Sequence, residues 1–296
     1  MNGVRIRAYA KLNLTLDVTG AEGGYHLLDS FVASVSLFDL LVLRKRKDGL
    51  VSVTMRGMGS ESIPPEENNA QRAGDAFVRE FGGGGADVTV YKNIPMGAGL
   101  GGSSADAAGV LSGMAALYGA DEAKLGGFCR MRGGGEDLAP VRGGGKLYFL
   151  LLCPRTSVSA GACYKEFDRA PSRSALTQSC IDAFVRGDTE GVGRYLSNAL
   201  YPAAVRLNPD VKTAYEEAKS FSPLGVAMTG SGSCVAALFE NKELCEWAKS
   251  RYRGKCRAYV AETVVPGPPS EKKGGRLSSP FALSEEEKRS TGYSGD

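Results

Sequence analysis

One glycine-rich segment constrains the fold of this chain more than any other. It reads IPMGAGLGGSSADAAGVL and occupies residues 94–111 of the 296. A strand-like run, ADVTVYKNIP, leads into it, and an alanine-rich run with helical character follows. A strand, a glycine loop and a helix in this order present backbone amides at the positive end of the helix, where phosphate binds well. The segment therefore predicts a phosphate site, with a glycine turn that serves packing alone as the alternative.

Two familiar phosphate motifs fit the segment poorly. Gly97, Gly99 and Gly102 satisfy the spacing G-x-G-x-x-G, and Asp121 follows about 20 residues later, as in dinucleotide-binding folds. Such a fold needs a second strand before the acidic residue, whereas ALYGADEAKL leads from one helix directly to the next. A Walker loop is excluded because no G-K-[ST] occurs. The dinucleotide interpretation remains the weaker alternative.

The rest of the chain reads as a mixture of strands and helices. Alternating or extended patterns predict strands in VRIRAYAKLNLTLDV, FVASVSLFDLLVLRKRK, GLVSVTM, KLYFLLLCP and CRAYVAETVV. Helical spacing predicts helices at residues 69–81, 176–186, 192–200, 211–219 and 243–252. Another helix follows the glycine segment, capped by Ser103 or Ser104 and ended by Gly119. The tail at residues 266–296 is poor in apolar residues and is predicted to be disordered.

Composition and charge exclude several classes of partner. The net charge is +3 and basic residues cluster only at residues 44–47, a solvated strand end, so no nucleic acid is expected. No membrane partner is expected either, because no run approaches about 18 consecutive apolar residues and no secretion signal is visible. The seven cysteines are widely spaced without a C-x-x-C pair, as free thiols are. We therefore expect a cytoplasmic protein.

Three segments together resemble the signature motifs of the GHMP small-molecule kinases. They are AYAKLNLTLDVTGAEGGYHLLDS, the loop at residues 95–108, and MTGSGSCVAALF. More narrowly, AKLNL followed by GYHLLDS resembles the 4-diphosphocytidyl-2-C-methyl-D-erythritol kinase family of non-mevalonate isoprenoid biosynthesis. The resemblance implies an α+β, two-domain GHMP kinase fold. An N-terminal ribosomal-protein-S5-like domain would span residues 1–152 and a C-terminal α/β sandwich domain residues 153–265.

The resemblance also implies a reaction. It is the ATP-dependent phosphorylation of the 2-hydroxyl of a small-molecule cytidine diphosphate substrate, 4-diphosphocytidyl-2-C-methyl-D-erythritol, by a monomer or homodimer. ATP and Mg²⁺ are the expected cofactors, and no metal ligand is assigned. A turn at residues 230–232 would narrow the site. The expected ATP-binding residues are Pro95, Met96, Gly97, Ala98, Gly99, Leu100, Gly101, Gly102, Ser103, Ser104 and Ala105, with the two serine hydroxyls near the phosphates and magnesium.

Five further residues acquire roles through the resemblance. Lys11 lies in an otherwise apolar strand, where a lysine is costly unless it is paired, used or snorkelling outward. In the family the matching lysine acts on the acceptor hydroxyl, so Lys11 is the expected catalytic residue, and Asn13 on the same strand face positions the substrate. Tyr25 and His26, the only histidine, would recognise the cytosine ring. Tyr164, otherwise a core tyrosine, would stack on that ring.

One family segment is missing. Family members carry a stretch resembling KLGADVPF before a GxGE segment, and its aspartate is the proposed catalytic base. Here GGGEDLAPVRGGGKLYFLLLCP matches the GxGE segment without a gap, so about ten residues, the aspartate among them, are absent between Leu125 and Phe128. A competing alignment matches GEDLAP to GADVPF and makes Asp137 the base. A solvated loop is the ordinary interpretation of Glu136 and Asp137.

The missing aspartate leaves more than one functional outcome open. A general base contributes about 10² to 10⁴-fold to a rate, and the loose transition state of phosphoryl transfer asks little of the attacking hydroxyl. We therefore expect an ATP-dependent kinase for this substrate. The alternatives are an ATP-binding homologue that is weakly active or inactive, and a GHMP kinase for another small alcohol.

Overall fold

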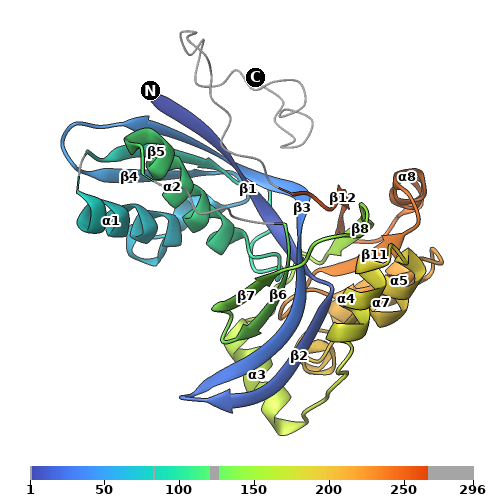
Figure 1. Cartoon of the computed structure of the whole chain (residues 1–296). Helices are drawn as coiled ribbons and strands as arrows, with labels where there is room; N and C mark the ends of the chain where they lie inside the picture. Colours follow the sequence, from blue (N-terminus) through green and yellow to red (C-terminus); the bar gives the residue numbers. More distant parts are fainter. Residues whose placement is uncertain (1, 83, 121–126, 266–296) are drawn as a thin grey trace.

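The computed structural model describes residues 2–82, 84–120 and 127–265. Within these ranges the chain forms two sheets and eight α-helices (Figure 1). The larger sheet consists of β1 (Gly3–Asn13), β2 (Thr15–Glu22), β3 (Tyr25–Lys45), β4 (Val51–Arg56), β5 (Ala86–Tyr91), β6 (Phe128–Gly133), β7 (Asp137–Pro140) and β9 (Ser197–Asn198). The smaller sheet consists of β8 (Tyr148–Cys153), β10 (Gly225–Met228), β11 (Val235–Phe239) and β12 (Arg257–Glu262), in the order β10-β11-β8-β12.

The helices lie in two groups. The first group is α1 (Asn69–Phe81) and α2 (Gly102–Tyr118). The second group is α3 (Ala160–Arg169), α4 (Thr177–Val185), α5 (Thr189–Tyr195), α6 (Tyr201–Leu207), α7 (Pro209–Lys219) and α8 (Lys242–Arg251). Figure 1 shows α1 and α2 side by side against the larger sheet, and the second group around the smaller sheet and the lower arm of β3.

The long strand β3 organises the larger sheet. Its first half pairs antiparallel with β2, its second half pairs with β5, and β1 runs along most of it. Lys11 of β1 lies opposite Ser34, while β6 joins the other edge of the same stretch, with Phe128 opposite Ala33. This register brings the end of β1, and with it Lys11, to the middle of the molecule, between the two sheets.

The alanine-rich character of α2 reflects close packing on the larger sheet. A Cβ added at Gly109 would lie 2.9 Å from Leu41 Cδ2, and one at Gly113 would lie 2.7 Å from Leu43 Cδ1. Larger residues would therefore push the helix away from β3. Because the phosphate loop ends where α2 begins, this packing fixes the position of the loop relative to the sheet.

One hydrophobic core joins the two sheets. Phe31 of β3, Phe149 of β8 and Phe184 of α4 are fully buried in it, together with Ile94 next to the phosphate loop. The predicted boundary between residues 152 and 153 falls within β8, which is the strand of the smaller sheet that pairs with both β11 and β12. The site between the sheets is therefore built on a continuous packed interior.

Most of the expected elements are present. The helix at residues 69–81 and the end of α2 at Gly119, which adopts the left-handed conformation, are confirmed. The helix expected at residues 192–200 is only partly correct, because α5 ends at Tyr195 and Ser197 pairs with Thr15 of β2. Helices α3 and α6 were not predicted. The tail at residues 266–296 lies outside the described residues.

The structure can also be compared with the expectations about the cysteines and about membrane-spanning helices. All seven cysteines are free thiols, as the sequence predicted, and five of them are buried. In the described part of the chain, no helix has the length and apolar character needed to span a membrane.

Candidate active site

The loop at residues 95–101 connects β5 to α2 and requires glycine at two positions. Gly99 has a φ of 76°, and a Cβ there would lie 2.2 Å from the carbonyl oxygen of Thr229. Gly101 has a φ of 72°, and a Cβ there would lie 2.9 Å from Cγ of Lys11. Both conformations are left-handed and favour glycine. The glycines thus allow the loop backbone to touch the neighbouring backbone and the lysine stem.

The start of α2 differs from the sequence prediction. Gly101, not Ser103 or Ser104, is the N-cap, and no side chain caps the helix. The prediction was wrong because the left-handed Gly101 turns the chain into the helix two or three residues earlier, which places both serines in the first turn. Their side chains are exposed, and Ser103 Oγ accepts a hydrogen bond of 2.9 Å from Asn69 Nδ2. Both hydroxyls therefore lie in the first turn of α2, the end of a helix at which anions bind.

The second glycine turn packs directly on this loop. Cys234 N donates a hydrogen bond of 3.1 Å to Ala98 O. Asn198 Nδ2 donates to the carbonyl oxygens of Met228 and Gly230, at 2.8 and 2.9 Å. The turn at residues 230–232 therefore borders the phosphate loop, as expected. Asn198 was missed because its partners lie about 30 residues away in sequence, beyond the reach of any local pattern.

Lys11 points into the loop rather than outward. Its Nζ donates hydrogen bonds to Asn13 Oδ1 at 2.5 Å and to Gly99 O at 2.7 Å. Burial lowers the pKa of Lys11 to about 8, an effect that the nearby Cys234 only partly opposes. No carboxylate of the described residues lies within ion-pair distance of Nζ. The lysine is therefore a half-buried cation whose described hydrogen-bond partners are a backbone oxygen and an amide oxygen.

The side chain of Asn13 forms hydrogen bonds to other residues of the protein through both its oxygen and its nitrogen. Its Oδ1 accepts from Lys11 Nζ and, at 3.0 Å, from Gly230 N. Its backbone N–H donates to Thr229 Oγ1 at 3.0 Å, and its Nδ2 donates to Ser30 Oγ at 2.8 Å. The residue is only 4% exposed. Asn13 thus joins β1 to the second glycine turn and orients Lys11.

A buried ion triad lies beneath the phosphate loop. Lys92 Nζ contacts Asp39 Oδ2, and Asp106 Oδ2 at 2.6 Å. Asp39 Oδ1 also accepts the backbone N–H groups of Asn93 and Ile94, at 2.6 and 2.8 Å. Burial and the Asp39 carboxylate raise the pKa of Asp106. The triad ties β3, the end of β5 and the first turns of α2 together, so it sets the conformation of the loop between them.

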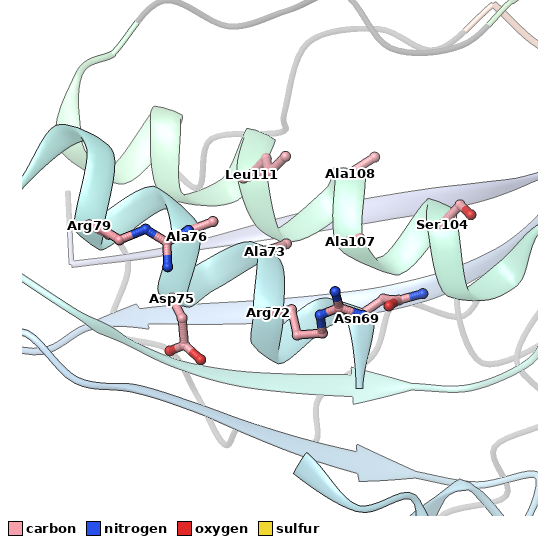
Figure 2. A pocket seen from close by; sticks show the side chains of 10 residues that line it. All are labelled: Asn69, Arg72, Ala73, Asp75, Ala76, Arg79, Ser104, Ala107, Ala108 and Leu111. Carbon is pink, nitrogen blue, oxygen red and sulfur yellow. The ribbon is translucent and has the colours of Figure 1, made fainter. Parts of the chain in front are cut away.

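A groove extends from the phosphate loop between α1 and α2. Its cavity volume is about 790 Å³. Figure 2 shows Ser104 at the end nearest the loop, and Asn69 and Arg72 on the facing wall. The lining residues are Asn69, Arg72, Ala73, Asp75, Ala76, Arg79, Ser104, Ala107, Ala108 and Leu111. Small residues on both helices leave this space open.

The residues expected to recognise cytosine are only partly brought together. The rings of His26 and Tyr164 stack with centroids 4.6 Å apart and an interplanar angle of 21°. His26 Nε2 lies 2.7 Å from Asp168 Oδ1, a partner that the sequence analysis missed. Tyr25 is 76% exposed at the hairpin between β2 and β3. The hairpin and α3 therefore form a second cluster, separate from the phosphate loop.

The structure places Asp137 far from Lys11. Asp137 lies opposite Arg132, which lies opposite Asp29 of β3, whereas Lys11 lies opposite Ser34 on the other side of β3. Strand spacing and rise along β3 give a separation of roughly 20 Å. The Asp137 carboxylate is half-exposed and pairs with Arg132 at 3.0 Å. Asp137 is therefore not in reach of the acceptor hydroxyl. Residue 125, where the missing segment begins, lies outside the described residues.

Comparison with known proteins identifies the family. The model of the GHMP kinases N terminal domain matches residues 68–145, and the GHMP kinases C terminal model matches residues 180–255. A 4-diphosphocytidyl-2-C-methyl-D-erythritol kinase of Symbiobacterium thermophilum is 34% identical over 295 residues, covering 88% of this chain and 100% of the relative. The protein of that name from Cutibacterium acnes is 33% identical over 264 residues, covering 79% and 85%.

Solved structures agree with the family models. A crystal structure of 4-(cytidine 5'-diphospho)-2C-methyl-D-erythritol kinase matches with a TM-score of 0.71 and 29% identity, covering 88% of this chain and 98% of that one. Homoserine kinase from Cytophaga hutchinsonii, at 16% identity and a TM-score of 0.67, shares the fold. The α+β GHMP kinase fold expected from the sequence is confirmed. The chain belongs to the GHMP kinases and, among them, to the 4-diphosphocytidyl-2-C-methyl-D-erythritol kinase family.

Proposed function

We propose that this chain transfers the γ-phosphoryl group of ATP to the 2-hydroxyl of 4-diphosphocytidyl-2-C-methyl-D-erythritol, in isoprenoid precursor biosynthesis. The observation that carries the proposal is the hydrogen bond of 2.7 Å between Lys11 Nζ and Gly99 O. It holds the ammonium group of Lys11 directly against the loop that would bind the phosphates. The free thiols of all seven cysteines favour a reducing compartment, so we place the reaction in the cytoplasm.

ATP would bind along the loop and the adjoining groove. The amides at the start of α2 and the hydroxyls of Ser103 and Ser104 face the space for the phosphates. The groove between α1 and α2 begins at Ser104 and is large enough for the adenosine part. Among the described residues no cluster of three or more His, Cys, Asp or Glu side chains is arranged to hold a metal ion. Exposed serine hydroxyls and phosphate oxygens are hard donors that suit Mg²⁺, which would neutralise phosphate charge when bound with ATP.

Lys11 would supply positive charge at the point of transfer. Binding of the ATP polyanion favours the protonated lysine and raises its pKa above the value of about 8 in the free chain. Two of its three N–H donors are fixed by Asn13 and Gly99, so the third is left for the acceptor oxygen or the transferred group. Because phosphoryl transfer depends mainly on positioning and charge neutralisation, this arrangement supports transfer without a neighbouring aspartate.

The cluster of His26, Tyr164 and Tyr25 would hold the cytosine of the acceptor. The stacked pair offers an edge with ring nitrogens, and the exposed Tyr25 offers an aromatic face. The distance between this cluster and Lys11 would be bridged by the diphosphate and the erythritol of the substrate. The β2–β3 hairpin would thus recognise the cytosine, and the phosphoryl group would be transferred at the phosphate loop.

A coupled assay of ADP release with the cytidylyl substrate tests the proposal. We expect turnover by the unchanged chain and a loss of at least about 100-fold in Lys11→Ala, as for loss of a charge that stabilises the transition state. Lys212→Ala, at an exposed position of α7, is the matched control and should retain full activity. Equal turnover by the unchanged chain and Lys11→Ala would contradict the catalytic role.

One observation favours a second candidate function. No described carboxylate lies at Lys11 Nζ, so ATP binding without transfer is the alternative. That alternative predicts that ATP raises the melting temperature while no ADP appears with the cytidylyl substrate. For a GHMP kinase that acts on another small alcohol, cytidine diphosphate should instead leave the melting temperature unchanged in the same assay.

A further inference from the structure

The two ring nitrogens of His26 have different surroundings. Nε2 lies 2.7 Å from Asp168 Oδ1, whereas Nδ1 has no hydrogen-bond partner among the described residues. The imidazole is 20% exposed and the carboxylate is 57% exposed, so the pair lies at the surface of the cluster, where a ligand has access. No role for Asp168 followed from the sequence motifs.

Asp168 determines which nitrogen of a neutral His26 carries the proton. An ionised carboxylate only accepts hydrogen bonds, and a neutral imidazole has a single N–H. The contact with Asp168 therefore requires the proton on Nε2 and leaves a lone pair on Nδ1. Nδ1 then acts as a hydrogen-bond acceptor toward a ligand.

Helix α3 fixes the imidazole in two further ways. Tyr164 and Asp168 are four residues apart and lie on the same face of α3. Tyr164 stacks on the imidazole face, with centroids 4.6 Å apart, and Phe167 contacts the ring edge-on, with centroids 6.4 Å apart and an interplanar angle of 83°. The stacking sets the plane of the ring, and Asp168 sets its rotation within that plane.

We propose that Asp168 is a specificity-determining positioning residue that holds His26 as the Nε2–H tautomer, so that Nδ1 accepts a hydrogen bond from the 4-amino group of cytosine. Uracil carries a carbonyl oxygen at this position and would place two acceptors against each other. The site would therefore select 4-aminopyrimidine nucleotides over uracil nucleotides. This inference rests on the proposed function, because it takes the cluster to be the cytosine site.

The charge arrangement of α3 supports a carboxylate that is available to His26. Glu166, on the same helix, contacts both Arg169 and Arg206, at 2.9 and 2.5 Å. These two cations are therefore engaged by Glu166, and the described ion pair of Asp168 is the one with His26. The Asp168 carboxylate is thus available to His26, because Glu166 holds the two neighbouring arginines.

Binding of cytidine diphosphate and uridine diphosphate tests the inference without requiring transfer. His26 is the only histidine, so long-range ¹H–¹⁵N spectra of the full chain report one imidazole. We expect the Nε2–H tautomer at neutral pH, a shift of Nδ1 on addition of cytidine diphosphate, and binding at least about 10-fold tighter than that of uridine diphosphate.

Asp168→Asn is the decisive variant, because its amide can either donate or accept. We expect the preference for cytidine diphosphate to fall to within about 3-fold of unity, with the melting temperature unchanged. Asp182→Asn, at an exposed position of α4, is the matched control and should keep the preference. An Nδ1–H tautomer or an imidazolium in the unchanged chain would overturn the inference, as would an equal loss of both ligands in Asp168→Asn. Cytidine selectivity without any ADP release would instead uphold the inference and contradict the transfer reaction.

Discussion

Oδ1 of Asn13 accepts hydrogen bonds from Lys11 Nζ and from the backbone N–H of Gly230 at the same time. A single amide oxygen thus joins the catalytic candidate to the second glycine turn, across 217 positions of sequence. The two glycine segments and Lys11 form one unit, because the lysine also bonds to Gly99 of the phosphate loop.

Replacement of Asn13 should disturb this unit. Asn13→Ala removes the acceptor for Lys11 Nζ and for Gly230 N, and it removes the Nδ2 donor to Ser30 Oγ. The backbone N–H of residue 13 still donates to Thr229 Oγ1. We expect the free energy of unfolding to fall by about 1–3 kcal/mol, the cost of leaving buried polar groups unsatisfied. Urea unfolding measures this loss, and kcat should fall more than the affinity for ATP. A variant with unchanged stability and kcat would show that the Asn13 bonds are not needed.

The lowered pKa of Lys11 predicts a proton uptake when ATP binds. The free chain has a pKa of about 8 at this residue, so the lysine is largely protonated at pH 7 and largely neutral at pH 9. Bound ATP raises the pKa, because negative charge stabilises the ammonium. ATP binding near pH 8.5 should therefore take up a proton, and affinity should fall as pH rises from 7 to 9.

Calorimetric titrations in buffers of different ionisation enthalpy measure this uptake directly. Lys11→Met removes the titrating group and should abolish both the uptake and the fall in affinity above pH 8. If the unchanged chain takes up no proton at pH 8.5, the lysine does not face the bound phosphates.

The elements that were predicted correctly from the sequence are those whose limits depend on residues close by in the chain. Helix α1 begins after Asn68, whose side chain accepts a hydrogen bond from Ala70 N. The apolar residues that indicated this helix all lie within it. The prediction of a serine cap for α2 was wrong because the N-cap is the left-handed Gly101, where a Cβ would lie 2.9 Å from Cγ of Lys11, 90 positions away in sequence. Helix α3 was missed because only two of its residues, Cys163 and Phe167, are buried.

The parts of the site that were missed depend on pairing between distant residues. Lys92 is buried only because Asp39 and Asp106 reach it from two other elements. Likewise, nothing near Asp168 in the sequence indicates that it meets His26, 142 positions away. Motifs identified Lys11 and the glycine loops, whereas tertiary contacts had to reveal which residues hold them.

The buried triad should dominate the stability of the loop region. Lys92→Met leaves the carboxylates of Asp39 and Asp106 buried without their cation, and such a loss typically costs about 3–5 kcal/mol. Lys47→Met, at an exposed position, is the control and should change stability by less than about 0.5 kcal/mol. Chemical denaturation of both variants measures the difference. Equal stabilities would mean that the triad is not formed in solution.

A bulky side chain in the groove between α1 and α2 should weaken the binding of ATP without affecting the acceptor. Ala107→Trp places an indole beside Ser104, on the wall that Figure 2 shows facing Asn69 and Arg72. If the adenosine part of ATP occupies this groove, KM for ATP should rise by about 10-fold or more, because the lost binding affects ground and transition states equally. KM for the cytidylyl substrate and kcat at saturating ATP should change by less than about 3-fold. Glu80→Trp adds the same side chain to an exposed position of α1 outside the groove and should leave KM for ATP unchanged. An unchanged KM for ATP in Ala107→Trp would place the adenosine elsewhere and restrict ATP recognition to the loop.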